Sequence, residues 1–401
     1  PAAIGSGTLL PTPSPAADGV LIPAGPAPGD PYGGLWFSGE YLLWTARGGV
    51  PQEVGALLST GGVPHQLFGS LPMRSYYSGL RASAGWSAPD RDFPGFDLGG
   101  FFLETGRGSL ASSVISHPAL HTALVPNALI LQPVVNGVIV VPGSRGIVDT
   151  PIPGPDGQLD LDASDTLTSG LRGTSKRTLW GLEANARSLP IYYGPVRLDG
   201  LVGFRHLSLR EQLTLQGDYT FAEPPAGGDP DETADNPEDG HTNVMHTFDT
   251  LNIQNRFYGA QVGTTFEARL GEGLVVSGFA KVAVGGNEEH VTAVGSTVLD
   301  ATTIETHAGG PFIPRPTQTL PGGLLTPATP VAIRSSHFTA LTELNINLGY
   351  QVTSFLETYV GYNYLYMNSV ARLGDQFLTA GGKGQGHLDL SGVDFGVRLR
   401  Y

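Results

Sequence analysis

The stretch FTALTELNINLGYQV at residues 338–352 decides the fold, because its side chains alternate between two chemically different faces. That period of two indicates an extended strand that meets an apolar medium on one side and a polar one on the other. The apolar face comprises Phe338, Ala340, Leu344, Ile346, Leu348, Tyr350 and Val352, and the polar face comprises Thr339, Glu343, Asn345, Asn347 and Gln351.

The same alternation recurs along the chain from residue 35 onward, and about ten such segments can be counted. Residues 258–270 repeat it most clearly, and residues 180–187, 196–205 and 393–401 follow the same period. The chain has 57 Gly and 32 Pro, with 14% charged residues, a composition that disfavours long soluble helices. The sequence therefore predicts an all-β protein.

The connections between these segments discriminate a membrane barrel from a soluble sandwich, because long and short connections alternate. Outer-membrane barrels combine tight periplasmic turns with long external loops, and only a closed sheet leaves no unpaired backbone edge in lipid. We therefore expect a closed antiparallel transmembrane β-barrel of about ten strands in a bacterial outer membrane, with both termini periplasmic. The expected external loops lie near 46–75, 105–176, 217–249, 286–335 and 371–386.

Composition excludes several other classes of protein. The longest uncharged stretch, residues 109–144, is interrupted by four prolines, so no membrane-spanning helix fits there. A net charge of -14 argues against nucleic acid as a partner, and the absence of cysteine excludes disulfides and thiolate metal sites. Residues 1–34 are rich in Pro, Ala and Gly and form an expected N-terminal arm or linker ahead of the barrel at 35–401.

Alternation also assigns side chains to the two faces of the barrel wall. Aromatic residues such as Trp36, Trp44 and Tyr359 are expected at the lipid headgroup level. We expect the lipid bilayer to contact Trp180, Leu182, Phe266, Leu344, Ile346, Leu348, Phe395, Val397 and Leu399. The expected lumen-lining residues are Glu183, Arg187, Arg197, Arg205, Glu267, Arg269, Glu343, Asn345, Arg398 and Arg400.

Several phrases of the sequence resemble a known family. They are GLWFSGEYLLWTARGG at 34–49, the segments at 78–107 and 178–215, and FDTLNIQNRFYG at 248–259. Together they resemble the planctomycete outer-membrane β-barrel proteins of the beta-barrel porin 7 type, over roughly 35–401. The resemblance implies a porin architecture and supplies no catalytic, cofactor or binding residues.

A barrel of ten strands has a narrow lumen, since water-filled porins need sixteen or more strands. The charged inward set is compatible with two interpretations. The first is a structural network of ion pairs that replaces a hydrophobic core, and the second is an ion-conducting pore. The first interpretation is preferred.

The segment ALILQPVVNGVIVV at 128–141 predicts a hairpin in the longest external loop, with Asn136 and Gly137 at the turn. An apolar hairpin in water needs a covering surface, so we expect it to pack within the loop or against another subunit rather than bind a ligand. A second copy of the chain, giving a homo-oligomer, or other envelope partners would meet the loops and the arm. The interface residues would be Val134, Val135, Asn136, Gly137, Val138 and Ile139.

The acidic loop at 218–249 predicts solvated carboxylates, with weak calcium candidates at Asp229, Asp231, Glu232 and Asp235. We expect no metal, cofactor or catalytic residue, and a structural or pore-forming envelope protein. The alternatives are a surface adhesin and an omptin-like protease. For the protease, His241 and His246 would lie beside Asp239 and Asp249 at the external rim.

Overall fold

The computed structural model describes residues 34–47, 54–60, 63–66, 76–87, 95–104, 108–110, 129–135, 138–139, 145–147, 166–222, 242–300, 302–304, 313–373 and 386–401. The expected arm at 1–34 lies outside this part of the chain except for Gly34. No helix among the described residues is long and apolar enough to cross a membrane.

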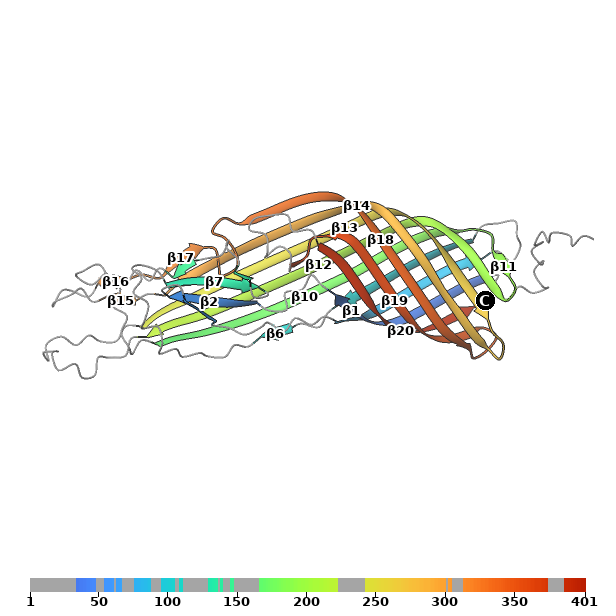
Figure 1. The fold of residues 1–401 in the computed structure, drawn as a ribbon, viewed down its shortest axis with the longest axis horizontal. Coiled ribbons are helices and arrows are strands. Elements are labelled where there is room, and N and C mark those ends of the chain that lie inside the picture. The colour runs from blue at the N-terminus through green and yellow to red at the C-terminus, as the bar shows by residue number, and fades with distance from the viewer. Residues whose placement is uncertain are drawn as a thin grey trace, which may run out of the picture.

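Ten antiparallel strands form a closed barrel, which confirms the predicted fold class (Figure 1). Each strand pairs with its neighbours along the chain, and β20 pairs with β1 to complete the cylinder. The strands are β1 (Gly34–Arg47), β4 (Tyr76–Ser87), β5 (Gly95–Glu104), β10 (Thr166–Arg187), β12 (Val196–Ala222), β13 (Thr242–Arg269), β14 (Leu274–Leu299), β18 (Val331–Gln351), β19 (Leu356–Val370) and β20 (Gly386–Arg400).

The pairing of β1 with β20 is continuous along β1. Its register runs from Trp36 opposite Arg400 to Arg47 opposite Asp389. Beyond β20, the Tyr401 amide donates to the Leu35 carbonyl at 2.9 Å. The first and last strands of the barrel therefore satisfy each other's backbone groups, and neither presents an open edge.

The two ends of the barrel differ. Short turns join β10 to β12, β13 to β14 and β18 to β19 at the end that also holds Gly34 and Tyr401, which we call the turn end. In the turn at 271–273 all three residues have positive φ, and the Leu274 amide donates to the Gly271 carbonyl at 2.9 Å. The opposite end is called the loop end.

Five neighbouring strands are far longer than a bilayer requires. The strands β10, β12, β13, β14 and β18 have 22, 27, 28, 26 and 21 residues, whereas about 9–11 suffice to cross the hydrocarbon core. They continue beyond the loop end as a curved sheet (Figure 1). The expected loops at 105–176, 217–249 and 286–335 were therefore too long, because these stretches contain the strand extensions.

Smaller strands accompany the barrel. A separate sheet contains β2 (Val54–Thr60), β3 (Val63–Gln66), β7 (Leu129–Val135), β8 (Val138–Ile139) and β9 (Arg145–Ile147). The pair β15 (Thr302–Ile304) and β16 (Ile313–Arg315) stands alone, while β6 (Gly108–Leu110), β11 (Ile191–Tyr193) and β17 (Gln318–Pro321) join barrel strands.

The predicted hairpin is present in the register of β7 and β8. Val134 lies opposite Ile139 and Val135 opposite Val138, which leaves two residues, Asn136 and Gly137, to connect the strands. Those two connecting residues are not among the described ones.

Barrel closure predicts that replacing two different glycines by alanine changes the free energy of unfolding by different amounts. A Cβ at Gly392 on β20 would lie 2.1 Å from the Leu43 carbonyl oxygen, whereas a Cβ at Gly39 on β1 meets nothing within 4 Å. Gly392→Ala is expected to lower the free energy of unfolding by about 1–3 kcal/mol, because the β1–β20 backbone must shift. Gly39→Ala is the matched control and should leave it unchanged within about 0.5 kcal/mol. Urea unfolding in detergent measures both, and equal stabilities would contradict this account of closure.

Candidate functional site in the barrel interior

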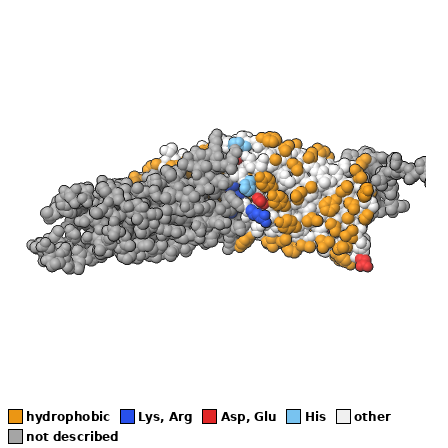
Figure 2. All heavy atoms as spheres, viewed as in Figure 1, with side chains coloured by type: hydrophobic (Ala, Val, Ile, Leu, Met, Phe, Trp, Pro, Cys, Tyr) orange, Lys and Arg blue, Asp and Glu red, His pale blue; other side chains and the backbone are white. Residues whose placement is uncertain are grey.

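The two faces of the wall have opposite chemistry. On β18, Leu344, Ile346 and Leu348 are 44–54% exposed on the outside, while Glu343 is 1% exposed on the inside. Figure 2 shows that apolar side chains cover the visible face of the barrel wall, and we call this outer apolar surface the apolar belt. The nine residues expected to contact lipid all lie on this outer face; Phe266 and Leu399 are half-buried, and the others are exposed.

Buried ion pairs cross the middle of the interior. Glu343 accepts from Arg81 and from Arg205 at 2.5 Å each, which joins β18 to β4 and to β12. Glu183 on β10 pairs with the same Arg205 and with Lys281 at 2.6 Å. Because adjacent pairs share members, the five side chains form one network that spans the lumen.

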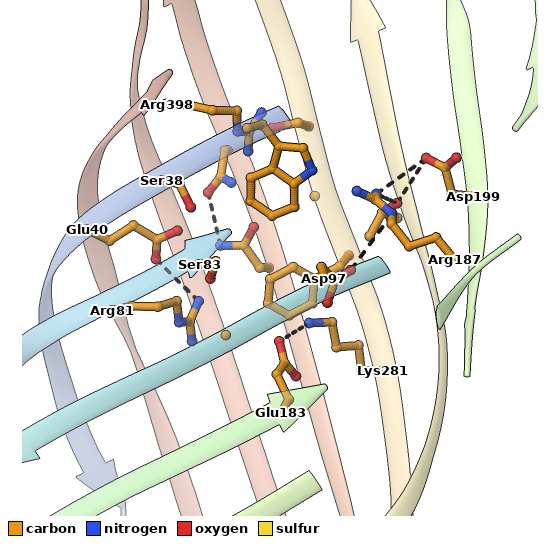
Figure 3. Close-up of a pocket in the computed structure, with 18 of the residues that line it drawn as sticks. Ser38, Glu40, Arg81, Ser83, Asp97, Glu183, Arg187, Asp199, Lys281 and Arg398 are labelled. Atoms are coloured by element: carbon orange, nitrogen blue, oxygen red, sulfur yellow. Dashed lines mark hydrogen bonds and ion pairs between the residues drawn. The ribbon is translucent and has the colours of Figure 1, made fainter. Parts of the chain in front are cut away.

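Polar groups from β1 and β19 extend this network. Arg81 reaches Glu40 at 3.3 Å, and Figure 3 shows this pair together with the contact between Glu183 and Lys281. The Tyr359 hydroxyl donates to Glu40 at 2.9 Å. The expectation that Tyr359 lies at the lipid headgroup level is therefore wrong, because it is an inward residue of β19 that is 6% exposed.

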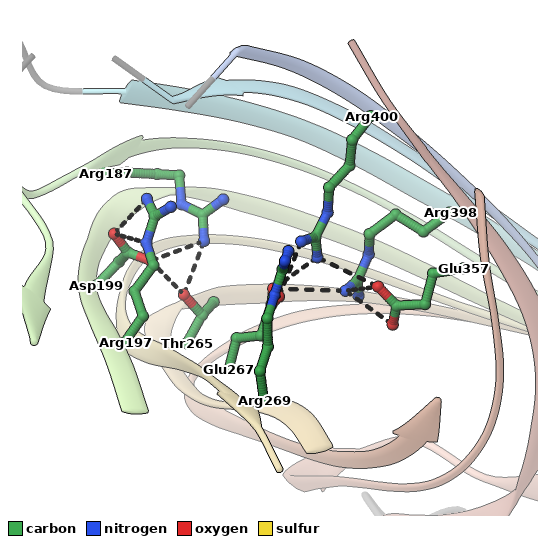
Figure 4. Close-up of polar contacts among 9 residues, drawn as sticks. All are labelled: Arg187, Arg197, Asp199, Thr265, Glu267, Arg269, Glu357, Arg398 and Arg400. Carbon is green, nitrogen blue, oxygen red and sulfur yellow. Dashed lines mark hydrogen bonds and ion pairs between the residues drawn. The ribbon is translucent and has the colours of Figure 1, made fainter. Parts of the chain in front are cut away.

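A second ionic layer lies at the turn end (Figure 4). Arg400 makes two hydrogen bonds to Glu267, at 2.8 and 2.6 Å, a bidentate geometry that is strong for a carboxylate. Across the mouth, Arg197 binds Asp199 at 3.0 Å, and Arg187 donates to Thr265 at 2.7 Å. Arg398 pairs with Glu357 at 3.4 Å, and Arg269 lies 3.5 Å from Glu267.

The ten residues expected to line the lumen all lie on the inner face, and nine of them take part in these two layers. The tenth, Asn345, donates to Asn363, which also accepts from Arg81. A cavity of about 140 Å³ lies among the inner-face residues. Its lining carries seven basic side chains (Arg and Lys) and six acidic ones (Asp and Glu), so its charges nearly cancel and the cavity attracts neither anions nor cations strongly.

An apolar layer lies on the loop-end side of the ionic network. Every barrel strand contributes to it, and its members are at most 8% exposed. The layer contains Leu42, Trp44, Ala46, Tyr77, Phe101, Leu103, Leu179, Leu207, Leu209, Phe257, Ala283, Leu341, Leu365, Met367, Val370, Leu388 and Leu390. A closed ring of strands that all direct apolar side chains inward at one level fills the lumen there.

Sequence reasoning missed this layer. Trp44 was expected at the headgroup level, but it is fully buried and its ring centroid lies 5.8 Å from that of Phe101. The signal was the consecutive apolar residues at 41–44 and 101–103, since apolar side chains on both faces indicate burial on both sides. The Arg81 guanidinium lies 5.5 Å from the Trp44 ring, so the ionic and apolar layers are in contact.

The segment that follows β19 folds back into the interior at the loop end. Glu211, which is fully buried, accepts from Arg372 Nε at 2.9 Å and from the Leu373 amide at 2.8 Å. Asn255 donates to the Ala371 carbonyl at 2.8 Å and accepts from its amide at 2.9 Å. These contacts place Ala371 and Leu373 in a second apolar cluster with Leu213, Leu215, Leu251, Ile253, Val291, Ala293 and Leu325.

A second inserted segment is held by one carboxylate. Asp249 on β13 accepts the amides of Leu324, Leu325 and Thr326 at 2.8, 3.0 and 2.9 Å, and the Thr326 hydroxyl at 2.7 Å. Leu324, Leu325 and Thr326 are all buried, at most 6% exposed. Asp249 therefore fixes the 324–326 segment against the concave face of the strand extensions.

The structure does not bring His246 and Asp249 together as the protease alternative expected. They lie on opposite faces of β13, because their positions differ by three and successive side chains of a strand alternate between faces. His246 instead lies 2.7 Å from Asp218 and 3.4 Å from Asp300, on the outer face beyond the apolar belt. Its hydrogen bond with Asp218 and the nearby charge of Asp300 raise the pKa of His246. His241 and Asp239 fall outside the described residues.

Within the described ranges, no group of three or more His, Asp or Glu side chains is arranged to hold a metal ion. The weak calcium candidates Asp229, Asp231, Glu232 and Asp235 lie outside those ranges.

The closed barrel and its filled interior can be compared with known proteins. The family described as Putative beta barrel porin-7 (BBP7) matches residues 36–380. The chain belongs to this family. It is therefore a porin-like β-barrel of the outer membrane, as the resemblance in its sequence implied. No curated protein matches the chain.

Several solved outer-membrane proteins are similar to it in structure. The outer membrane protease OmpT of Escherichia coli has 13% identity and a TM-score of 0.35, with 91% of this chain and 97% of that chain covered. The toluene transporter TodX of P. putida has 9% identity and a TM-score of 0.20, covering 94% and 91%. The toluene transporter TbuX of Ralstonia pickettii has 7% identity and a TM-score of 0.19, covering 92% and 90%.

The ionic network predicts a large loss in the free energy of unfolding when the carboxylate of Glu343, which two arginines share, is removed. Glu343→Gln leaves Arg81 and Arg205 buried without their common counter-charge, so we expect a loss of about 3–5 kcal/mol in the free energy of unfolding. Glu104→Gln is the control, because Glu104 and its partner Lys176 are 38% and 42% exposed, and it should cost less than about 1 kcal/mol. Chemical unfolding in detergent compares the two, and similar costs would show that the network is not a stabilising unit.

The Asp249 contacts predict local release of the inserted segment. In Asp249→Asn the new amide group faces N–H donors, so the amides of residues 324–326 should exchange with solvent about tenfold faster or more. Asp300→Asn removes an outer-face carboxylate that is 47% exposed and should leave their exchange unchanged. Hydrogen exchange followed by mass spectrometry measures both variants, and unchanged exchange in Asp249→Asn would contradict the assigned role.

Proposed function

We propose that this protein is a sealed outer-membrane barrel that anchors a β-sheet at the cell surface, rather than a diffusion pore. The apolar layer carries the proposal, because side chains from all ten strands meet there with almost no exposed area. Nearly all side chains of the layer are aliphatic or aromatic, so an ion that enters it loses its hydration with little compensation.

The ion pairs add a second barrier on the turn-end side of that layer. Glu343 and Arg205 are 1% and 3% exposed, and both oxygens of Glu343 already bind guanidinium groups. A passing ion would have to compete with these contacts. The narrow, charged lumen thus acts as a rigid filling, which agrees with the structural interpretation of the sequence.

Pore formation is the second candidate function. The observation that favours it is the 140 Å³ cavity, lined by charged residues of both ionic layers, which would become part of a conducting path if the apolar layer opened. Its nearly balanced charge would give such a path little ion selectivity.

The orientation is also part of the proposal. The short turns lie at the same end of the barrel as the start of β1 and the end of β20, and the long strand extensions lie at the other end. In outer-membrane barrels the short turns are periplasmic, so the loop end would face the cell exterior. The outer-face residues of the belt, including Leu182, Ile346 and Phe395, would then contact lipid hydrocarbon.

A surface sheet on a sealed anchor is compatible with the adhesin alternative. Self-association through the loops and arm stays a prediction, because most of those segments lie outside the described residues. A planctomycete source and the absence of enzyme activity also stay predictions.

Conductance in a planar bilayer tests the proposal directly. The wild-type protein is expected to give no ion steps, because the apolar layer blocks the lumen. The triple variant Trp44→Ala, Phe101→Ala and Phe257→Ala removes three large rings from that layer and is expected to conduct.

The matched control changes a residue adjacent to each of these on the same strand, Leu43→Ala, Phe102→Ala and Tyr258→Ala, whose side chains lie on the outer face. This control should remain silent. Ion steps from the wild-type protein would overturn the sealed barrel in favour of a pore.

A further inference from the structure

Basic side chains gather on the outer face of the wall, at the loop-end border of the apolar belt. Arg210 on β12, Arg256 on β13 and Arg334 on β18 are all exposed, and His290 on β14 lies among them. Their outward direction follows from alternation, because the neighbouring Glu211, which is fully buried, and the other odd-numbered residues of these strands point inward. We call Arg210, Arg256, His290 and Arg334 the basic patch.

The strand register makes the basic patch compact. Arg210 lies opposite Gln254, Gln254 opposite His290, and His290 opposite Arg334, so these four residues form one row across four strands. Arg256 is two residues from Gln254, which makes it the diagonal neighbour of both Arg210 and His290. Diagonal neighbours on a sheet face are about 7–8 Å apart and directly opposed ones about 5 Å, so guanidinium groups can reach a shared ligand.

Gln254 helps to position Arg256. With its carboxamide oxygen turned toward the guanidinium, Gln254 accepts from Arg256 Nε at 3.1 Å and from a terminal nitrogen at 3.2 Å. This contact uses one side of the guanidinium fork and leaves the remaining N–H donors available. Ser336 lies in the same row as Arg256 and is exposed, so it adds a hydroxyl group to the polar surface.

A row of aromatic rings indicates where the basic patch lies relative to the membrane. His206 stacks on Tyr258 with centroids 4.5 Å apart and meets the edge of Trp180 at 4.7 Å. Phe338 continues this border on β18 and is 76% exposed. Rings of this kind prefer the lipid headgroup level, and Arg256 lies two residues beyond Tyr258 on the loop-end side.

The arginines of the basic patch are not held in ion pairs within the described part of the chain. None of its three arginines lies within ion-pair distance of a carboxylate there, although Glu288 is the cross-strand neighbour of Arg256. A cluster of exposed arginines is notable in a protein of net charge -14. Exposed guanidinium groups beside a hydrocarbon-facing belt meet the headgroups of whichever lipid surrounds the barrel.

We propose that the basic patch binds the phosphate groups of a phosphorylated glycolipid in the outer leaflet. Guanidinium groups form bidentate, charge-assisted hydrogen bonds with phosphate, and the nearby serine and amide side chains suit sugar hydroxyls. The acyl chains would lie along the apolar belt below, against residues such as Val262 and Ile346. The choice of leaflet rests on the orientation given under the proposed function.

The test measures the affinity of the full-length protein in detergent for bisphosphorylated lipid A, by native mass spectrometry. The double variant Arg210→Gln/Arg256→Gln is expected to bind it about tenfold more weakly or worse, because two charge-assisted contacts are lost. The control Arg47→Gln/Arg172→Gln removes two other exposed outer-face arginines and should bind like the wild-type protein. Equal affinity of all three proteins would overturn the site.

Two further lipids define the ligand. Dephosphorylated lipid A should bind the wild-type protein as weakly as the intact lipid binds the double variant, and equally tight binding would show that phosphate is not recognised. Phosphatidylglycerol should bind more weakly than lipid A, and equal affinity would overturn the glycolipid in favour of any anionic lipid. These outcomes are independent of bilayer conductance, so the proposal of a lipid site and the proposal of a sealed lumen can be disproved separately.

Discussion

The backbone pairing of β1 with β20 is the constraint on which the rest of the structure depends. In hydrocarbon an unpaired N–H or C=O costs several kcal/mol, so a sheet that stopped short of closure would be excluded from the membrane. Closure also separates inside from outside, and every alternating strand must then send one set of side chains into a confined space. The close backbone approach at Gly392 belongs to this junction, where β20 packs against Leu43 and Trp44.

The interior is stabilised in two different ways along its length. In the turn-end half, Arg81, Arg205 and Lys281 neutralise Glu343 and Glu183, and the shared partners hold strands that are distant in sequence in one register. Buried ion pairs contribute little net free energy relative to apolar packing, but breaking one is costly, so this half favours a unique arrangement. In the loop-end half, apolar packing removes surface from water and contributes stability directly. The Arg81 guanidinium over Trp44 joins the two halves.

The sequence predicted which side chains of the barrel strands point inward or outward better than it predicted the contacts that fill the interior. Alternation at 338–352 is a local property, so the direction of Glu343 and Ile346 could be predicted without knowing any neighbour. The partners of Glu343 could not, because Arg205 is 138 residues away and the pairing depends on how the cylinder closes. The inserted segments at 324–326 and 371–373 carry no period at all, since Asp249 and Glu211 hold them through backbone amides. The strand extensions did alternate, with Leu213 and Leu215 between polar residues, but their length exceeded what a bilayer requires.

The five long strands run without interruption from the membrane wall into the sheet beyond it. A pull on the outer end of β13 would therefore act along the strand axis, and its many cross-strand hydrogen bonds with β12 and β14 would share the load in shear instead of opening one after another. Hydrogen bonds loaded together resist far more force than bonds loaded singly. The continuous strands thus attach the extended sheet to the barrel with a mechanical strength that a separate domain on a flexible linker would lack.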